Sequence, residues 1–157
     1  MVAEKYKLPF SVLVVVYTPL LEVLLLERAD HPGYWQSVTG SQNSGESLSE
    51  TAAREVKEET GLDAHQYPLH DWNTENVYEI YQEWRHRYAP GVIHNTERVF
   101  GLQLPRATDI TVAPREHLQF AWLPYQDAAA KVFSSSNAEA IFRLPKMELE
   151  HSKKESV

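Results

Sequence analysis

The sequence contains no cysteine, and this absence excludes a disulfide framework as well as a metal site built from thiolates. Long apolar runs are also missing, because the longest one, from Val12 to Val16, has only the length of a strand. Positive charge is in deficit: 22 acidic residues against 15 lysines and arginines give a net charge of −7. This charge argues against nonspecific binding to nucleic acid. We therefore expect neither a nucleic-acid partner nor a membrane partner.

The chain has the size and composition of one globular domain. Its 157 residues suffice for a proper core, and 43% hydrophobic with 24% charged residues is typical of soluble proteins. The first residues, Met1 to Lys7, lack an apolar core followed by a small-residue cleavage site. We expect a cytoplasmic protein without an obligate protein partner. Residues 1–147 are predicted to form the domain, and residues 148–157 to form a polar, disordered tail.

Hydrophobic patterning predicts strands before and after one central helix, with further helices near the end. The run Leu8 to Tyr17 is almost entirely apolar, which predicts a strand that is buried on both faces. The other expected strands are Val23–Arg28, Tyr34–Thr39, Asp71–Trp84, Glu97–Leu104 and Leu118–Leu123, and the later helices are Pro124–Lys131 and Asn137–Leu144. This order predicts an α/β (α+β) fold, a mixed β-sheet sandwiched between α-helices.

The central helix lies within the stretch from Gly40 to Leu62, and its ends are marked by capping signals. Ser47 and Glu50 have the spacing of a capping box, and Gly61 suits the left-handed residue that follows a helix. The glutamates of this helix stand three and four residues apart, so that they share a face. Like charges on one face are unfavourable unless a cation lies among them, and carboxylate oxygens suit a hard divalent cation.

The same stretch matches the pattern Gly-x5-Glu-x7-Arg-Glu-U-x-Glu-Glu-x-Gly-U, where U is aliphatic, at every fixed position. The alternative interpretation is a solvated helix rich in glutamate and lysine, but chance agreement at seven fixed positions is on the order of 10⁻⁹. The stretch resembles the Nudix box. This resemblance implies a Nudix hydrolase, in which a loop, helix and loop hold Mg²⁺ or Mn²⁺ and a nucleoside diphosphate linked to another group is cleaved.

The resemblance also implies roles for the charged residues. The expected metal ligands are Glu55, Glu58, Glu59 and Glu116, and the expected catalytic residues are Arg54, Glu58 and Glu116. Arg54 is expected to orient the glutamates by bidentate pairing, and Glu46 to support them from the loop. Glu116 contacts the metal or serves as base for the attacking water, and both roles remain open.

The segments around the box resemble the branch of the family that acts on a pterin triphosphate; they are Phe10–Tyr17, Tyr34–Ser41, Arg85–Val92, His94–Glu97 and Glu116–Leu118. The predicted substrate-binding residues are Lys7, Arg28, Thr39, Tyr78, Glu79, Ile80, Tyr81, Glu116 and Ser134. Tyr78 and Tyr81 would stack on the pterin, and Glu79 would accept hydrogen bonds from the N–H groups of the pterin ring. The alternative is that the segment Tyr78–Tyr81 is simply a strand with one buried face. A basic loop with Arg85, His86, Arg87, His94 and Arg98 either holds the phosphates or is simply solvated. The expected partner is a small-molecule triphosphate substrate.

Two other functions compete with the pterin triphosphate hydrolase. One is a house-cleaning pyrophosphohydrolase that acts on nucleoside triphosphates, and the other is a binding module that has lost catalysis.

Overall fold

The computed structural model describes residues 6–155, with side chains as far as residue 151. The elements are β1 (Phe10–Tyr17), β2 (Glu22–Arg28), β3 (Trp35–Gln36), β4 (Val38–Ser41), α1 (Leu48–Thr60), η1 (Ala64–Gln66), β5 (Leu69–Glu79), η2 (Gln82–Arg87), β6 (His94–Gln103), β7 (His117–Pro124), α2 (Tyr125–Lys131), α3 (Ser135–Phe142) and α4 (Leu144–Glu155). Residues 1–5, which belong to the segment that lacks the features of a secretory signal, lie outside the described residues. So do residues 156–157 of the predicted tail. No helix among the described residues is long and apolar enough to cross a membrane.

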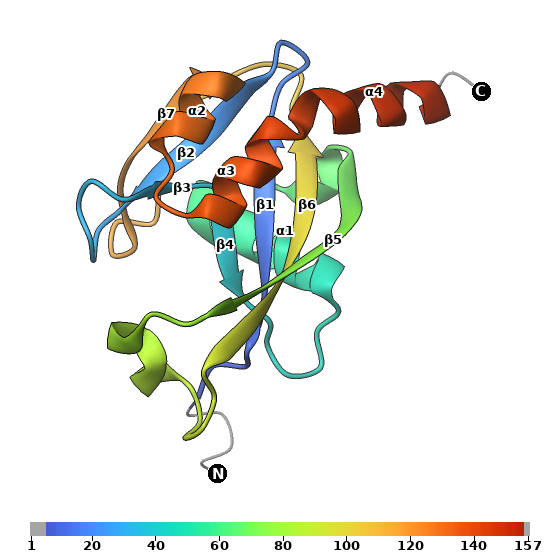
Figure 1. Ribbon diagram of the computed structural model, residues 1–157. Helices are drawn as coiled ribbons and strands as arrows, with labels where there is room; N and C mark the ends of the chain where they lie inside the picture. The colour runs from blue at the N-terminus through green and yellow to red at the C-terminus, as the bar shows by residue number, and fades with distance from the viewer. Residues whose placement is uncertain (1–5, 156–157) are drawn as a thin grey trace.

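One mixed sheet forms the centre of the fold. Its strand order is β3-β2-β1-β6-β5, with β4 paired to β1 and β7 paired to β2. The central strand β1 runs parallel to β6, whereas the other pairings are antiparallel. Helix α1 covers one face of the sheet, and α3 and α4 cross the other face (Figure 1). This arrangement confirms the predicted mixed sheet between helices.

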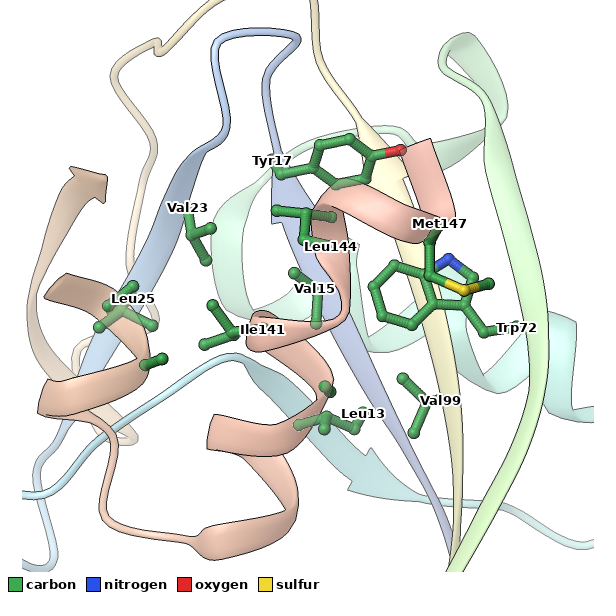
Figure 2. Packing of buried hydrophobic residues seen from close by; sticks show 13 residues of the cluster. Leu13, Val15, Tyr17, Val23, Leu25, Trp72, Val99, Ile141, Leu144 and Met147 are labelled. Atoms are coloured by element: carbon green, nitrogen blue, oxygen red, sulfur yellow. The ribbon is translucent and has the colours of Figure 1, made fainter. Parts of the chain in front are cut away.

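The apolar run of β1 supplies both layers of the core, as predicted. Side chains of a strand alternate between its faces, so that Leu13 and Val15 point to one cluster while Val12 and Val14 point to the other. In the first cluster, helices α3 and α4 press Ile141, Leu144 and Met147 against the sheet (Figure 2). In the second, the apolar side of α1 packs on the opposite face. Burying a valine fully stabilises the fold by about 1.5–3 kcal/mol.

The hairpin of β5 and β6 departs from the predicted boundaries. The strand expected to reach Trp84 ends at Glu79, because the chain turns there into the 3₁₀ helix η2. The guanidinium of Arg85 stabilises this turn by donating to the carbonyl of Ile80 at 3.0 Å. Strand β6 begins at His94, three residues before the predicted start, so that His94 and Arg98, which were both counted with the basic loop, belong to a strand. Arg98 is held there by Asp71 and Glu75 of β5.

The segment predicted to be a disordered tail continues as helix α4 as far as Glu155. Its first residue, Glu148, accepts hydrogen bonds from the hydroxyl of Tyr17 at 2.8 Å and from the amide of Gln103 at 3.2 Å. These contacts tie the helix to the ends of β1 and β6, which composition alone could not reveal. The predicted disorder was therefore wrong for residues 148–155, which are helical. The prediction that the domain ends at residue 147 stays a prediction.

Candidate active site

Helix α1 begins and ends where its capping signals predicted. The hydroxyl of Ser47 accepts the amide of Glu50 at 3.1 Å, and the carboxylate of Glu50 accepts the amide of Ser47 at 2.8 Å. Gly61 follows the helix with a φ of 78°, and its amide donates to the carbonyl of Lys57. A residue with a side chain is strained at this φ, so glycine is favoured. The caps fix the register of the helix and with it the direction of each glutamate.

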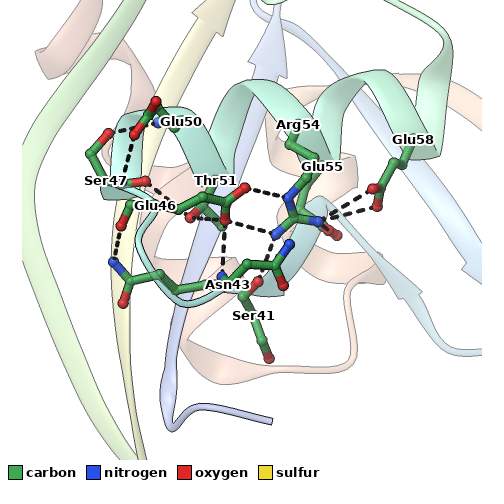
Figure 3. Close-up of polar contacts among 10 residues, drawn as sticks. Ser41, Asn43, Glu46, Ser47, Glu50, Thr51, Arg54, Glu55 and Glu58 are labelled. Carbon is green, nitrogen blue, oxygen red and sulfur yellow. Dashed lines mark hydrogen bonds and ion pairs between the residues drawn. The ribbon is translucent and has the colours of Figure 1, made fainter. Parts of the chain in front are cut away.

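Arg54 lies at the centre of a network that joins α1 to the preceding loop (Figure 3). Its Nε donates to Glu46 at 2.6 Å, and its Nη2 donates to the carbonyl of Ser41 at 2.9 Å. Its Nη1 contacts Glu55 and lies 3.3 Å from Glu58. One guanidinium therefore positions the loop and two of the box glutamates, as expected from the resemblance.

Glu46 accepts more hydrogen bonds in this network than Glu55 or Glu58 does. Its hydrogen bonds from Arg54 lower its pKa from 4.5 to about 2, with further help from the amide of Asn43 and the hydroxyl of Thr51. A pKa that is depressed by folding gives a contribution to stability that is present above the unfolded pKa. This contribution disappears as the pH falls through the folded pKa.

The Glu46→Gln variant is therefore expected to be less stable than wild type at neutral pH. We expect the free energy of unfolding to fall by about 1–2 kcal/mol at a pH of about 7, a figure that allows for solvent screening of this charge-assisted pair. The difference should shrink as the pH falls from 4.5 towards 2. Urea unfolding in metal-free buffer at neutral and acidic pH measures it, and a difference that does not depend on pH would contradict the ion-pair explanation.

Glu55 and Glu59 are buried side by side on the sheet-facing side of α1. Their exposed fractions are 8% and 2%, and Oε1 of Glu59 is buried without a hydrogen-bond partner among the described residues. Burial raises the pKa of both carboxyl groups, and their mutual proximity adds to the rise for Glu59. His117 Nε2 lies 3.8 Å from Glu59 Oε1, but burial lowers the pKa of this histidine to about 4, which leaves it neutral at physiological pH.

These carboxylates fit a divalent cation. They are hard oxygen donors, one of them has an unpartnered buried atom, and the neighbouring His117 supplies no charge. Gly40 of β4 is the close neighbour of Glu55, since a Cβ built on it would lie 1.9 Å from Glu55 Oε2. The glycine thus makes room for the carboxylate. In the described part of the chain, no group of three or more His, Asp or Glu side chains is arranged so that it could hold a metal ion by itself, and water and substrate phosphate would have to supply further ligands.

The remaining predicted metal ligands lie in different places. Glu116 lines the same cavity as Glu55 and Glu59, and the chain on which it lies is fixed by the bond from the amide of Ala29 to the Glu116 carbonyl. Glu58 does not line this cavity; its side chain is 51% exposed and is directed at Arg54. The structure therefore places Glu55, Glu59 and Glu116 in the wall of one cavity, and it leaves Glu58 on the outer side of the helix.

The cavity that these carboxylates line has a volume of about 1040 Å³ and also carries basic side chains. Lys7, Arg28, Arg87 and Arg115 lie in its wall together with Thr39 and the Arg54 network. Lys7 is placed there because its amide donates to the carbonyl of Arg87 at 2.9 Å, which joins the N-terminal segment to η2. Of the predicted basic loop only Arg87 reaches the cavity. Arg85 instead pairs with Glu79.

A second cavity of about 440 Å³ adjoins the first and has an aromatic lining. Tyr78, Trp84 and Tyr88 line both cavities, as do Arg28, Gln36 and Thr39. The predicted residues Glu79, Ile80, Tyr81 and Ser134 line only this second cavity. Ser134 is also the N-cap of α3, where its hydroxyl accepts the amide of Asn137 at 3.1 Å.

Several lining residues were missed from the sequence. Arg115 directly precedes Glu116, and its position beside a predicted ligand was an available signal. Trp84 and Phe133 line the second cavity because η2 and the turn before α3 come together in the fold. No local sequence pattern predicts that these two segments meet. Glu97 was given no role in the site, although it shares one face of β6 with the buried residues Asn95 and Val99.

Buried carboxylates and basic side chains in one cavity, on a mixed sheet covered by helices, suit a divalent cation together with a small phosphorylated molecule. The NUDIX domain family matches residues 7–144. The chain belongs to the NUDIX domain family, whose hydrolases generally need divalent metal ions.

The relatives agree with this assignment. A dihydroneopterin triphosphate diphosphatase from Escherichia coli is 48% identical to this chain over 139 residues, which is 87% of this chain and 91% of that protein. Its counterpart from Haemophilus influenzae is 39% identical over 140 residues, 87% of each protein. The solved structure of the E. coli dihydroneopterin triphosphate pyrophosphohydrolase superposes with a TM-score of 0.81 at 47% identity, covering 87% of this chain and 94% of that one. The prediction of a Nudix hydrolase is confirmed.

Proposed function

We propose that this chain hydrolyses 7,8-dihydroneopterin 3′-triphosphate to dihydroneopterin monophosphate and pyrophosphate, a step of folate biosynthesis. The observation that carries the proposal is the pair of adjoining cavities, one with carboxylates and cations and the other with aromatic side chains. A triphosphate fits the first and a flat heterocycle fits the second. The names of the E. coli and H. influenzae relatives support this choice of substrate.

In this proposal Glu55, Glu59 and Glu116 hold Mg²⁺, with Mn²⁺ as a substitute. The ion supplies positive charge to the phosphate oxygens and to the attacking water. Arg54 keeps the carboxylate of Glu55 in place through their ion pair. The preference for Mg²⁺ rests on its tendency to combine carboxylate ligands with waters and substrate phosphates.

The basic residues of the first cavity bind the phosphates. Lys7, Arg28, Arg87 and Arg115 place positive charge in a protein whose net charge is −7, so that a polyanion is attracted locally. The guanidinium of Arg28 is held by Asp30 at 2.7 Å and by Gln36 at 3.0 Å, which orients it at the junction of the two cavities. A cytoplasmic location and independence from an obligate protein partner stay predictions.

The products test the proposal. Incubation of the purified chain with dihydroneopterin triphosphate and Mg²⁺ should release pyrophosphate and the monophosphate, and a chelator should stop the reaction. Phosphate and pyrophosphate are measured separately. Release of inorganic phosphate without pyrophosphate would contradict the proposed reaction.

A further inference from the structure

Glu97 is a buried carboxylate that has no part in the phosphate chemistry described above. It lies on β6, its exposed fraction is 4%, and it lines the second cavity but not the first. Among the described residues no cation pairs with it, since none of the ion pairs of this part of the chain includes Glu97. A buried acid without a cationic partner is costly for the fold, and such groups are concentrated at functional sites.

The hydrogen bonds to Glu97 fix its carboxylate and leave accepting capacity unused. Ser136 Oγ donates to Oε1 at 3.0 Å, and Asn76 Nδ2 donates to the same oxygen at 3.4 Å. Neither bond uses Oε2, and a carboxylate has about four acceptor positions in all. Burial raises the pKa of Glu97, while the two hydrogen bonds act in the opposite direction by favouring the ionised form. A fixed acceptor in the wall of the cavity is thus available to a ligand that brings N–H donors.

The rest of the second cavity suits the flat ring system of such a ligand. Tyr81 lies 5.1 Å from Trp84 and 6.5 Å from Phe133 between ring centroids, and all three line the cavity. The three rings are tilted against one another, by 51° and 44°, and together they put aromatic surface into the wall of the cavity, on which a flat heterocycle can pack. The phosphates of the same ligand would extend past Arg28 at the junction into the first cavity.

We propose that Glu97 selects the heterocycle of the substrate by accepting two parallel hydrogen bonds, from a ring N–H and from the amino group beside it, one at Oε2 and one at the position of Oε1 where the 3.4 Å contact of Asn76 gives way. This inference rests on the proposed function and names the residue that determines its specificity. Pterin and guanine both present this pair of donors. Adenine presents an amino group beside an unprotonated ring nitrogen, whose lone pair faces the carboxylate unfavourably.

Glu79, to which the sequence assigned this role, is less suited to it. Its side chain is 67% exposed and its carboxylate pairs with Arg85 at 3.2 Å. A solvated carboxylate that already has a cationic partner discriminates weakly, because water replaces any hydrogen bond that a wrong ring fails to make. Burial makes the same failure costly at Glu97, since the carboxylate is then left unpaired.

The Glu97→Gln variant tests the proposal. Glutamine has the same size but replaces one accepting oxygen by an NH₂ donor, so that the pair of donors on the pterin can no longer be matched. We expect kcat/KM for dihydroneopterin triphosphate to fall about 100-fold, mainly through KM, and kcat/KM for dATP to change less than about threefold. The control is Glu83→Gln, which removes an equal charge from exposed η2 outside both cavities and should change neither value.

An equal loss for both substrates, or no loss for either, would overturn the role of Glu97. If wild type prefers dATP to the pterin triphosphate, the proposed function fails, and the ratio of GTP to ATP hydrolysis then tests Glu97 separately. Wild type should prefer GTP, and the variant should lose this preference. If the wild-type protein hydrolyses GTP no better than ATP, the role of Glu97 is overturned, and this test does not depend on whether the variant folds.

Discussion

The Glu59→Gln variant is expected to lose about a thousandfold in kcat, because an uncharged amide cannot hold the cation that stabilises the reacting phosphates. Glu59 is 2% exposed, and its Oε1 has no hydrogen-bond partner among the described residues. Glutamine has the same shape, and it removes a charge that burial and the neighbouring Glu55 disfavour. The fold should therefore be retained, and the metal-free variant should be at least as stable as wild type.

Two measurements together separate the ligand role from a structural role. Steady-state kinetics with Mg²⁺ gives the loss of kcat, and thermal unfolding with and without Mg²⁺ gives the binding of the ion. Added Mg²⁺ should raise the Tm of wild type and leave that of the variant nearly unchanged. The Glu58→Gln variant is expected to lose less, about tenfold at most, because its side chain is 51% exposed and lies outside the cavity. Activity of the Glu59 variant above about a tenth of wild type would refute the ligand role.

Gly40→Ala is expected to reduce kcat/KM about 100-fold while lowering Tm by only a few degrees. The added Cβ would lie 1.9 Å from Glu55 Oε2 and 2.1 Å from its Cδ, so that the carboxylate has to move. The end of a glutamate side chain can swing aside at modest cost to the fold. The ion-binding position of that carboxylate is lost when it does so, and the positions of ligands matter on a scale of about 1 Å.

A double-mutant cycle with Glu55→Asp tests this explanation. Aspartate is shorter by one methylene and leaves space for the new methyl group. Gly40→Ala should therefore cost much less in the Glu55→Asp background than in wild type, which is the non-additivity expected of residues in contact. Equal losses in both backgrounds would show that the methyl group acts through the backbone of β4 and not through Glu55.

Local sequence signals determined the parts of the structure that depend on near neighbours. The apolar run Val12–Val16 predicted a strand buried on both faces, and each face of β1 indeed lies in its own core cluster. The spacing of Ser47 and Glu50 and the position of Gly61 predicted both ends of α1. The box pattern predicted the network around Arg54, because its members lie close together in sequence, from Ser41 at the end of β4 through the loop to Glu58 on α1.

Features that depend on distant segments were not predictable in the same way. The charge of Arg98 was counted with the basic loop, yet Arg98 pairs with Asp71, 27 residues away, across the β5–β6 hairpin. The cavity collects Lys7, Arg28 and Arg115 from three separate segments, and no local pattern specifies that they meet. Glu97 gave the faintest signal, an acid in a largely buried strand, and only the tertiary structure shows that it lines the aromatic cavity. The box helix and its network were thus predictable from local sequence, whereas the two cavities are assembled by contacts between distant elements.

The comparison of kcat/KM for dihydroneopterin triphosphate and for dATP, with wild-type protein and saturating Mg²⁺, most directly tests the assignment of this chain. Both substrates require the same cation site and the same phosphate-binding residues, so their ratio depends on the second cavity. We predict a preference of at least about tenfold for the pterin substrate, with pyrophosphate as the product. A clear preference for dATP would contradict the assignment and would identify a house-cleaning nucleoside triphosphate pyrophosphohydrolase instead.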